Sequence, residues 1–170
     1  ANQALVFQPT PAELEGIDAA EEDAEPSSVA DAVQRAKEAF GNLVFLESAE
    51  KSAAKSPYMG ATKVYRALEA LDAVATVAFA NSAKSVNWEQ ELRQRCSLKR
   101  YSDHVSDTTL GKYRSEYEFV YNGAKTLFEP HLTLGSGAPN TCASIHFIRD
   151  NQARKVVIGH VGRHLSNTKK

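Results

Sequence analysis

The sequence contains few of the residues that cross-link small proteins. Two of its 170 residues are cysteines, Cys96 and Cys142, and neither belongs to a C-x-x-C motif. Such sparse thiols argue against a disulfide framework and against a thiolate zinc site. A chain of this length also buries enough apolar surface to fold without disulfides or a structural metal. We therefore expect a protein of a reducing, cytoplasmic environment.

Long apolar runs and a signal peptide are missing as well. No stretch approaches the roughly 20 apolar residues that cross a bilayer. The first residues are polar and acidic, whereas a signal peptide starts with a basic segment that precedes an apolar one. We expect no membrane association and no secretion. Because the chain starts at Ala1 with an unpatterned polar stretch, we also expect it to be the C-terminal part of a longer protein.

Basic residues are absent from the start of the chain and outnumber acidic ones at its end. Residues 1–30 carry seven acidic side chains and no lysine or arginine, whereas residues 91–170 carry thirteen basic and seven acidic side chains. Acidic, proline-containing segments bury little surface, so residues 1–27 are predicted to form a disordered arm. Alternatively, the arm folds back over the basic C-terminal surface as a decoy for an anion.

Apolar residues recur at the helical interval in the first half of the chain. They predict one helix over 29–56, bent or divided near Gly41, and a second over 60–81. A third, shorter amphipathic helix is predicted over 84–95. This part of the chain is therefore expected to be helical.

After residue 100 the period of the apolar pattern changes to two. Asn122-Gly123 has the sequence of a type I′ hairpin turn. Because a two-residue loop sets the register, Tyr121 should face Ala124. The strands are predicted over 117–121, 124–134, 143–148 and 155–161.

These patterns together predict an α+β fold. N-terminal helices over 28–98 are followed by a C-terminal four-stranded antiparallel β-meander within a β-rich region over 112–166. We expect residues 28–170 to form a single domain.

All five histidines lie in the last 67 residues, so chemistry is expected there. On a strand, His131 and Thr133 of the H-L-T-L segment point the same way. An imidazole can move a proton near neutral pH while the hydroxyl binds the same phosphate oxygens, so both are candidate catalytic residues. Alternatively, His131 is a half-buried histidine that bonds Glu116, Glu129 or Arg114.

Residues 131–134 resemble the H-x-T-x half-motif of the two-histidine phosphoesterases. Those enzymes need two such tetrapeptides facing each other in one cleft. This chain has one, because neither His146 nor His160 is followed two residues later by serine or threonine. We therefore predict binding roles for His146 and His160.

The last residues combine imidazoles with cations. His160 and His164 have a spacing that suits zinc on a helix, but such residues lie about 13 Å apart on a strand. No cluster of carboxylates or cysteines completes a set, so we predict neither a metal nor a cofactor. His164 with Arg114 and Arg163 instead suits an RNA backbone, the imidazole as a catalytic proton carrier and the arginines as phosphate-binding groups. Alternatively, this segment is only a charged, solvated end.

The segment K-V-V-I-G-H-V-G-R-H-L near the chain end resembles the last hairpin of RelE-type toxins. These ribonucleases cleave mRNA with basic and imidazole side chains instead of a metal. The likeness covers the C-terminal third, while the helical part is longer and the lysine and arginine content lower than in those toxins. In addition, P-H-L-T-L-G, S-I-H-F and V-I-G-H-V-G-R-H-L together resemble a block in uncharacterised bacterial proteins, some associated with phage defence or mobile elements.

Two classes of function follow. The first is a nucleic-acid-directed, RNA-favoured domain of a bacterial defence or toxin-like system, acting as a metal-independent phosphodiesterase or only as a binder of RNA or DNA. The second is a non-catalytic protein-interaction or oligomerisation domain, because the apolar helical stripes exceed what a four-stranded sheet can cover. Convergence of His131, His160 and His164 around one open pocket would favour the enzyme.

Overall fold

The computed structural model describes residues 24–80 and 85–168, so most of the predicted acidic arm lies outside the described residues. A five-stranded mixed sheet has the order β2-β8-β7-β6-β3, and β4 and β5 form a separate hairpin. The elements are α2 (Val29–Ala39), β2 (Leu43–Phe45), α3 (Glu47–Lys55), α4 (Ala61–Ala80), α5 (Trp88–Arg95), β3 (Arg100–Ser102), α6 (Asp107–Tyr117), β4 (Glu118–Tyr121), β5 (Ala124–Leu127), β6 (His131–Gly135), β7 (Cys142–Asp150) and β8 (Lys155–Gly162).

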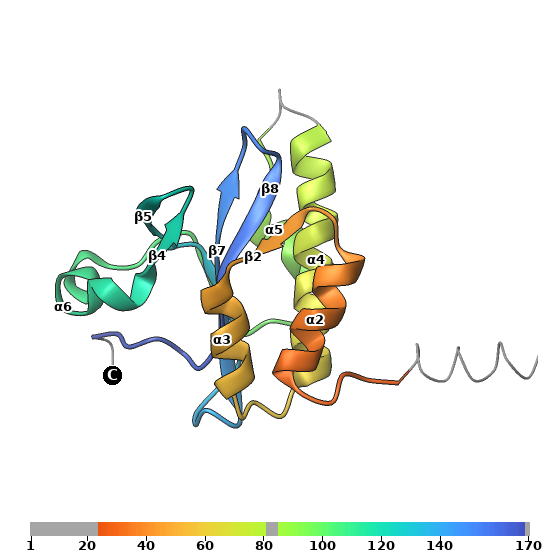
Figure 1. Cartoon of the computed structure of the whole chain (residues 1–170), viewed down its shortest axis with the longest axis horizontal. Helices are drawn as coiled ribbons and strands as arrows, with labels where there is room; N and C mark the ends of the chain where they lie inside the picture. The colour runs from red at the N-terminus through yellow and green to blue at the C-terminus, as the bar shows by residue number, and fades with distance from the viewer. Residues whose placement is uncertain (1–23, 81–84, 169–170) are drawn as a thin grey trace, which may run out of the picture.

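The two faces of the main sheet differ in chemistry. Helices α2, α4 and α5 lie on one side of the sheet, and α6 with the β4–β5 hairpin lies on the other (Figure 1). The helix-facing side carries apolar side chains of the buried core, among them Leu132, Ile145 and Ile158. The other side carries imidazoles and hydroxyls, because side chains alternate between faces along a strand and the register irregularity between His146 and Phe147 puts His160 on the face opposite to Ile158. The residues with these imidazoles and hydroxyls are Ser102, His131, Thr133, Ser144, His146 and His160.

The α+β prediction is confirmed, but the four-stranded antiparallel meander is wrong. The helix predicted over 29–56 is divided near Gly41, as expected, into α2 and α3, but Leu43–Phe45 between them forms a strand that pairs in parallel with Val156–Ile158. Asn42 fixes the break, since its backbone N–H donates to Asp72 Oδ1 at 2.9 Å. Long-range pairing therefore outweighs the helical spacing of this segment.

The second prediction that fails concerns residues 100–117. A short edge strand, β3, and helix α6 occupy this segment, so the start of the region predicted to be β-rich, with Arg114 and Glu116, is helical. Ser106 caps α6 by accepting the backbone N–H of Thr109 at 3.2 Å. The helix is irregular, because Tyr113 inside it has non-helical φ and ψ of −126° and 23°, which explains the weak helical pattern.

The predicted hairpin turn is confirmed, but its second strand is shorter than expected. Asn122 has a φ of 51° and Gly123 of 79°, as a type I′ turn requires, and Tyr121 faces Ala124. The predicted strand over 124–134 breaks before Pro130, and its two halves join different sheets as β5 and β6. Proline lacks the N–H that an uninterrupted ladder needs.

Helix α3 covers an edge of β8 that β2 is too short to pair. Strand β2 pairs with β8 only as far as Ile158. For the residues of β8 that follow, two serines of α3 form the hydrogen bonds that a neighbouring strand would form. Ser48 Oγ donates to Gly159 O at 2.6 Å, and Ser52 Oγ accepts the Val161 N–H at 3.0 Å. Side chains of α3 thus satisfy the backbone groups at this edge of β8, which anchors α3 along the edge.

We expect Ser52→Ala to lower the free energy of unfolding by about 1–3 kcal/mol, because the buried Val161 N–H loses its acceptor. Urea unfolding would measure the loss, and amide hydrogen exchange should accelerate at Val161. Ser97→Ala is the matched control, since Ser97 is exposed. Equal stability of the two variants would contradict this account of the β8 edge.

The β4–β5 hairpin is held against the main sheet by two aromatic rings. Phe119 and Phe128 meet edge to face, with ring centroids 5.3 Å apart. A Cβ added to Gly159 would lie 2.7 Å from a ring carbon of each phenylalanine. A glycine in β8 is therefore what allows the hairpin to approach.

None of the helices within the described ranges has the length and apolarity needed to cross a membrane.

Candidate histidine pocket

Three histidines form a row across the polar face of the sheet. His131 on β6 pairs with His146 on β7, which pairs in turn with His160 on β8. The His131 and His146 rings stack with centroids 4.6 Å apart and planes inclined by 14°. His160 meets His146 edge-on at 5.8 Å. The row depends on the register of three strands, including an irregularity between His146 and Phe147.

Each of these rings, and that of His164, is oriented by a backbone carbonyl. His131 Nδ1 lies 2.7 Å from Glu129 O, and His146 Nδ1 lies 3.1 Å from Phe128 O. A carbonyl oxygen can only accept, so the nitrogen facing it carries the hydrogen. The same argument places hydrogens on His160 Nε2, 2.7 Å from Arg163 O, and on His164 Nδ1, 2.9 Å from Leu165 O.

Burial keeps two of the histidines neutral. Desolvation, and then repulsion from His131 and His160, lowers the pKa of His146 well below its usual value of 6.5. Desolvation also lowers the pKa of His160 to about 4, against the hydrogen bond to the Arg163 carbonyl. Near pH 7 both rings are therefore uncharged, which suits hydrogen bonding and packing better than proton transfer.

A small pocket opens where His131 and His146 meet the C-terminal segment. We call it the histidine pocket; its volume is about 100 Å³. None of the described residues that line it is acidic. Cations and hydrogen-bond donors with no carboxylate among them suit an anion. The polar wall includes Arg100, Ser102, His104, His131, His146 and His164.

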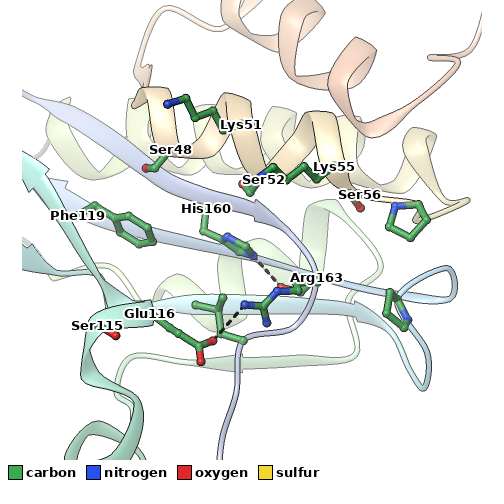
Figure 2. A pocket seen from close by; sticks show the side chains of 13 residues that line it. Ser48, Lys51, Ser52, Lys55, Ser56, Ser115, Glu116, Phe119, His160 and Arg163 are labelled. Atoms are coloured by element: carbon green, nitrogen blue, oxygen red, sulfur yellow. Dashed lines mark hydrogen bonds and ion pairs between the residues drawn. The ribbon is translucent and has the colours of Figure 1, made fainter.

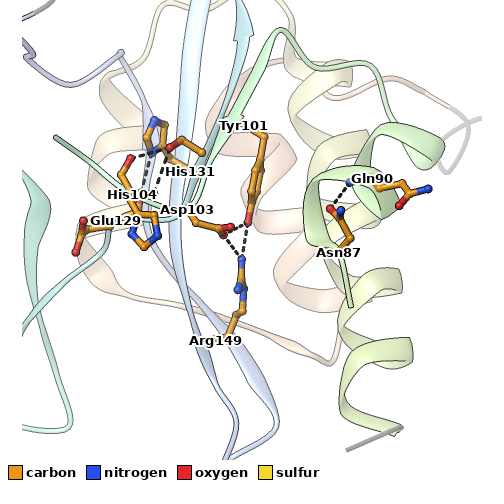
Figure 3. Close-up of polar contacts among 9 residues, drawn as sticks. Asn87, Gln90, Tyr101, Asp103, His104, Glu129, His131 and Arg149 are labelled. Atoms are coloured by element: carbon orange, nitrogen blue, oxygen red, sulfur yellow. Dashed lines mark hydrogen bonds and ion pairs between the residues drawn. The ribbon is translucent and has the colours of Figure 1, made fainter. Parts of the chain in front are cut away.

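The edge strand with Arg100, and the loop with His104 that follows it, are fixed by a charged cluster around Arg149 of β7. The Arg149 guanidinium donates to the Tyr101 hydroxyl and to Asp103, and Tyr101 donates to Asp103 at 2.7 Å (Figure 3). Arg149 also lies over the Trp88 ring, 4.6 Å from its centroid. This cluster ties β3 and the loop after it to the centre of the sheet.

Helix α6 holds the C-terminal segment that carries His164 through hydrogen bonds and an ion pair. Tyr117 donates its hydroxyl to Ser166 O at 2.7 Å, and Glu116 accepts the Ser166 N–H at 3.0 Å. The Arg163 guanidinium lies 3.4 Å from the same Glu116 carboxylate. Burial opposes ionisation of Glu116, but the Ser166 hydrogen bonds and the charge of Arg163 outweigh it and lower the pKa of this carboxyl.

A second, larger pocket lies on the opposite side of the C-terminal segment, against α3. We call it the α3 groove; its volume is about 560 Å³. Figure 2 shows Lys51 and Lys55 on its α3 side, with Arg163 and Glu116 across from them. Side chains of the C-terminal segment divide between the two pockets, since Arg163 lines the groove and His164 the histidine pocket.

The structure brings some of the predicted site residues together and separates others. His131 and His164 share the histidine pocket with His146, whereas His160 and Arg163 line the α3 groove, so the expected convergence of His131, His160 and His164 on one pocket fails for His160. The remaining two, Thr133 and Arg114, line neither pocket.

Thr133 and Arg114 have surroundings of their own. Thr133 is buried, and its Oγ1 has no hydrogen-bond partner among the described residues. It faces Ser144, whose Oγ is likewise buried and unsatisfied. Arg114 is exposed on α6 and pairs with Glu118 at 3.0 Å.

Sequence reasoning missed Arg100 and His104. Arg100 belongs to a three-residue strand, too short for an alternating pattern to reveal. His104 lies in the loop before α6. A signal was present in Ser106, two residues after His104, which caps a helix that begins at Asp107. Reading that cap would have placed His104 in a structured turn.

Comparison with protein-family models, curated proteins and solved structures found no match to this chain. The resemblances to RelE-type toxins and to defence-associated proteins therefore stay predictions.

Proposed function

We propose that this chain is an RNA-directed domain that binds a phosphodiester in the histidine pocket and cleaves it without a metal ion. Its setting in a bacterial defence or toxin-like system rests on the sequence resemblance alone. The observation that carries the proposal is the meeting of His131, His164 and Arg100 in one pocket that no described acidic side chain lines.

The size of the pocket indicates which part of RNA would enter. A volume of about 100 Å³ suits a phosphate group or a few water molecules, and it is well below the roughly 300–1,000 Å³ of pockets that hold whole ligands. Recognition there would involve the backbone and not the base. Arg100 would bind the phosphate oxygens, because a guanidinium pairs with two oxygens at once.

Metal-independent RNA cleavage needs a general base and a general acid, and two imidazoles can fill these roles. One takes the proton of the ribose 2′-hydroxyl, whose oxygen then attacks phosphorus. The bond from phosphorus to the 5′-oxygen breaks as the other imidazole gives a proton to that oxygen. Arg100 would stabilise the charge that develops on the phosphate. In this scheme His131 and His164 carry the protons, while neutral His146 packs against His131 and helps to fix its position.

Three labelled single strands of one sequence test the proposal in the presence of EDTA: RNA, DNA and 2′-O-methyl RNA. We expect cleavage of RNA alone, because the other two lack the internal nucleophile. His131→Gln and His164→Gln should each lower the rate by about 100-fold or more. Arg114→Gln is the matched control and should leave the rate unchanged, since Arg114 lies outside the pocket.

Two results would contradict the proposal. Equal cleavage of all three strands would exclude a mechanism through the 2′-hydroxyl, and failure to bind any of them would exclude a nucleic-acid role. Tight, salt-sensitive binding without cleavage would retain the RNA-directed role and remove the catalytic one.

The alternative of a protein-interaction domain loses its original basis. It was expected from apolar helical stripes too wide for a four-stranded sheet. In α4 most of those positions, including Leu68 and Leu71, are buried within the chain, although Val77 is not. Among the described residues only Met59, Val77 and Val120 are large exposed hydrophobic side chains. Isolated apolar residues of this kind are ordinary on protein surfaces.

A further inference from the structure

We propose that the α3 groove is a binding site for a nucleoside monophosphate. This inference rests on the residues of the groove and does not depend on the chemistry proposed for the histidine pocket. The groove has a volume of about 560 Å³, within the range of pockets that hold small-molecule ligands. It combines a cationic part with an apolar part, as the two ends of a nucleotide require.

The cationic part has capacity for a phosphate group. Lys51 and Lys55 are one helical turn apart on α3, so they project from the same face of the helix. Lys51 lies 3.6 Å from Glu47, but both side chains are exposed, and such a pair contributes little. Lys55 forms no ion pair within the described ranges. Both ammonium groups can therefore turn toward an anion in the groove.

Across the groove, Arg163 adds a third cation, and Glu116 is the one carboxylate among the described lining residues. That carboxylate is already engaged by Arg163 at 3.4 Å and by the Ser166 N–H at 3.0 Å. Its lowered pKa keeps it ionised near neutral pH. The described lining therefore carries three cations against one satisfied anion, which favours a ligand with about two negative charges, as a phosphate monoester has.

The apolar part of the groove suits a base and a sugar. The Phe119 ring lies at one end of the groove, on the side of β4 (Figure 2). Its edge-to-face contact with Phe128 and its packing on Gly159 hold it in place. Pro57, Pro139 and Leu165 add apolar surface. Bases stack on aromatic rings without strong sequence preference, so the site should accept more than one base.

His160 supplies a polar group at the floor between these parts. Its Nε2 donates to Arg163 O at 2.7 Å, which leaves Nδ1 as the ring's acceptor. The residue is 6% exposed and lines the groove. Because its lowered pKa keeps the ring neutral near pH 7, Nδ1 can accept a hydrogen bond from a ribose hydroxyl. A phosphate without sugar or base would not use this contact.

Isothermal titration calorimetry with AMP, ribose 5-phosphate and adenosine tests the proposal on the full chain. We expect AMP to bind about tenfold or more tightly than either fragment, because each fragment lacks one half of the contacts. Replacing both lysines, Lys51→Gln with Lys55→Gln, should weaken AMP binding by about tenfold. Lys63→Gln is the matched control, an exposed lysine of α4 outside the groove.

A separate pair of variants distinguishes this site from the histidine pocket. His131→Gln with His164→Gln should leave AMP affinity unchanged, whereas Phe119→Leu should weaken it while ribose 5-phosphate binding persists. AMP binding that the lysine variants do not alter would overturn the proposal, and so would equal affinity for AMP and ribose 5-phosphate. If the histidine variants alone abolish AMP binding, the nucleotide belongs to the histidine pocket and the groove is not its site.

Discussion

Acidification from pH 7 to pH 5 is expected to destabilise this protein through its buried histidines. The pKa of His160 is lowered from 6.5 to about 4, and that of His146 is also lowered well below 6.5. Between these values the unfolded chain binds protons that the folded chain does not bind, so the free energy of unfolding falls as the pH falls. For His160 alone the expected loss between pH 7 and pH 5 is about 2 kcal/mol, and His146 adds to it.

Urea unfolding at a series of pH values would measure this effect. The carboxyl groups with lowered pKa, including Asp103 and Glu116, add their own loss only at more acidic pH, because their unfolded values are 3.8 and 4.5. His160→Gln should flatten the profile between pH 5 and 7. Exposed His104→Gln should preserve it, and an unfolding free energy that does not change over this interval would contradict the burial of the two rings.

Phe128→Ala is expected to lower the free energy of unfolding by about 3–5 kcal/mol, as removal of a buried aromatic ring does. The Phe128 side chain has no exposed surface, and it packs against both Phe119 and Gly159. Its backbone also connects the hairpin to the site, because Phe128 O accepts the hydrogen of His146 Nδ1 at 3.1 Å. Losing the ring should therefore loosen the support of both pockets.

Chemical denaturation would quantify this change, with Val120→Ala as the control. Val120 is on the same hairpin but is 62% exposed, so its truncation should alter the stability by less than about 0.5 kcal/mol. If the two variants were equally stable, the hairpin could not depend on the Phe128 contact. Ligand titrations of Phe128→Ala at low temperature would show whether the pockets lose affinity as the hairpin loosens.

The two pockets have a common structural origin in the polar face of the sheet. Most sheets of this size bury apolar side chains on a covered face, whereas here His146 and His160 are 2% and 6% exposed. Burying neutral imidazoles lowers stability in mild acid, as argued above, and apolar side chains at these positions would avoid that loss. A binding or catalytic role for this face gives a reason for retaining them.

Local patterns in the sequence were sufficient to predict several secondary-structure elements. The Asn122-Gly123 turn was correctly predicted with its register, because both residues tolerate the positive φ that the turn needs. The helix expected over 60–81 was found as α4, Ala61–Ala80, because its apolar residues keep the helical interval throughout. The concentration of histidines near the C-terminus directed attention to the sheet face where His131, His146 and His160 lie together, and a functional role for that face stays a prediction.

Other features depend on contacts between distant segments, which no local pattern contains. Strand β2 exists because Leu43–Phe45 can pair with Val156–Ile158, over a hundred residues later. The close approach of Phe119 and Phe128 to Gly159 is another contact of this kind, which no local pattern contains. The break before Pro130 likewise separates β5 from β6, whereas the alternating apolar pattern predicted one continuous strand there.

The sequence by itself determined the α+β composition, the hairpin turn and the part of the chain that carries imidazoles, since these follow from residue type and local spacing. Only the tertiary structure decided which imidazoles meet. His131 and His146 are adjacent because β6 and β7 pair in one particular register, and Arg100 joins them through an edge strand of three residues. A pocket is formed by the pairing of strands and the path of the C-terminal segment over them, and both are set by the packing of the whole domain.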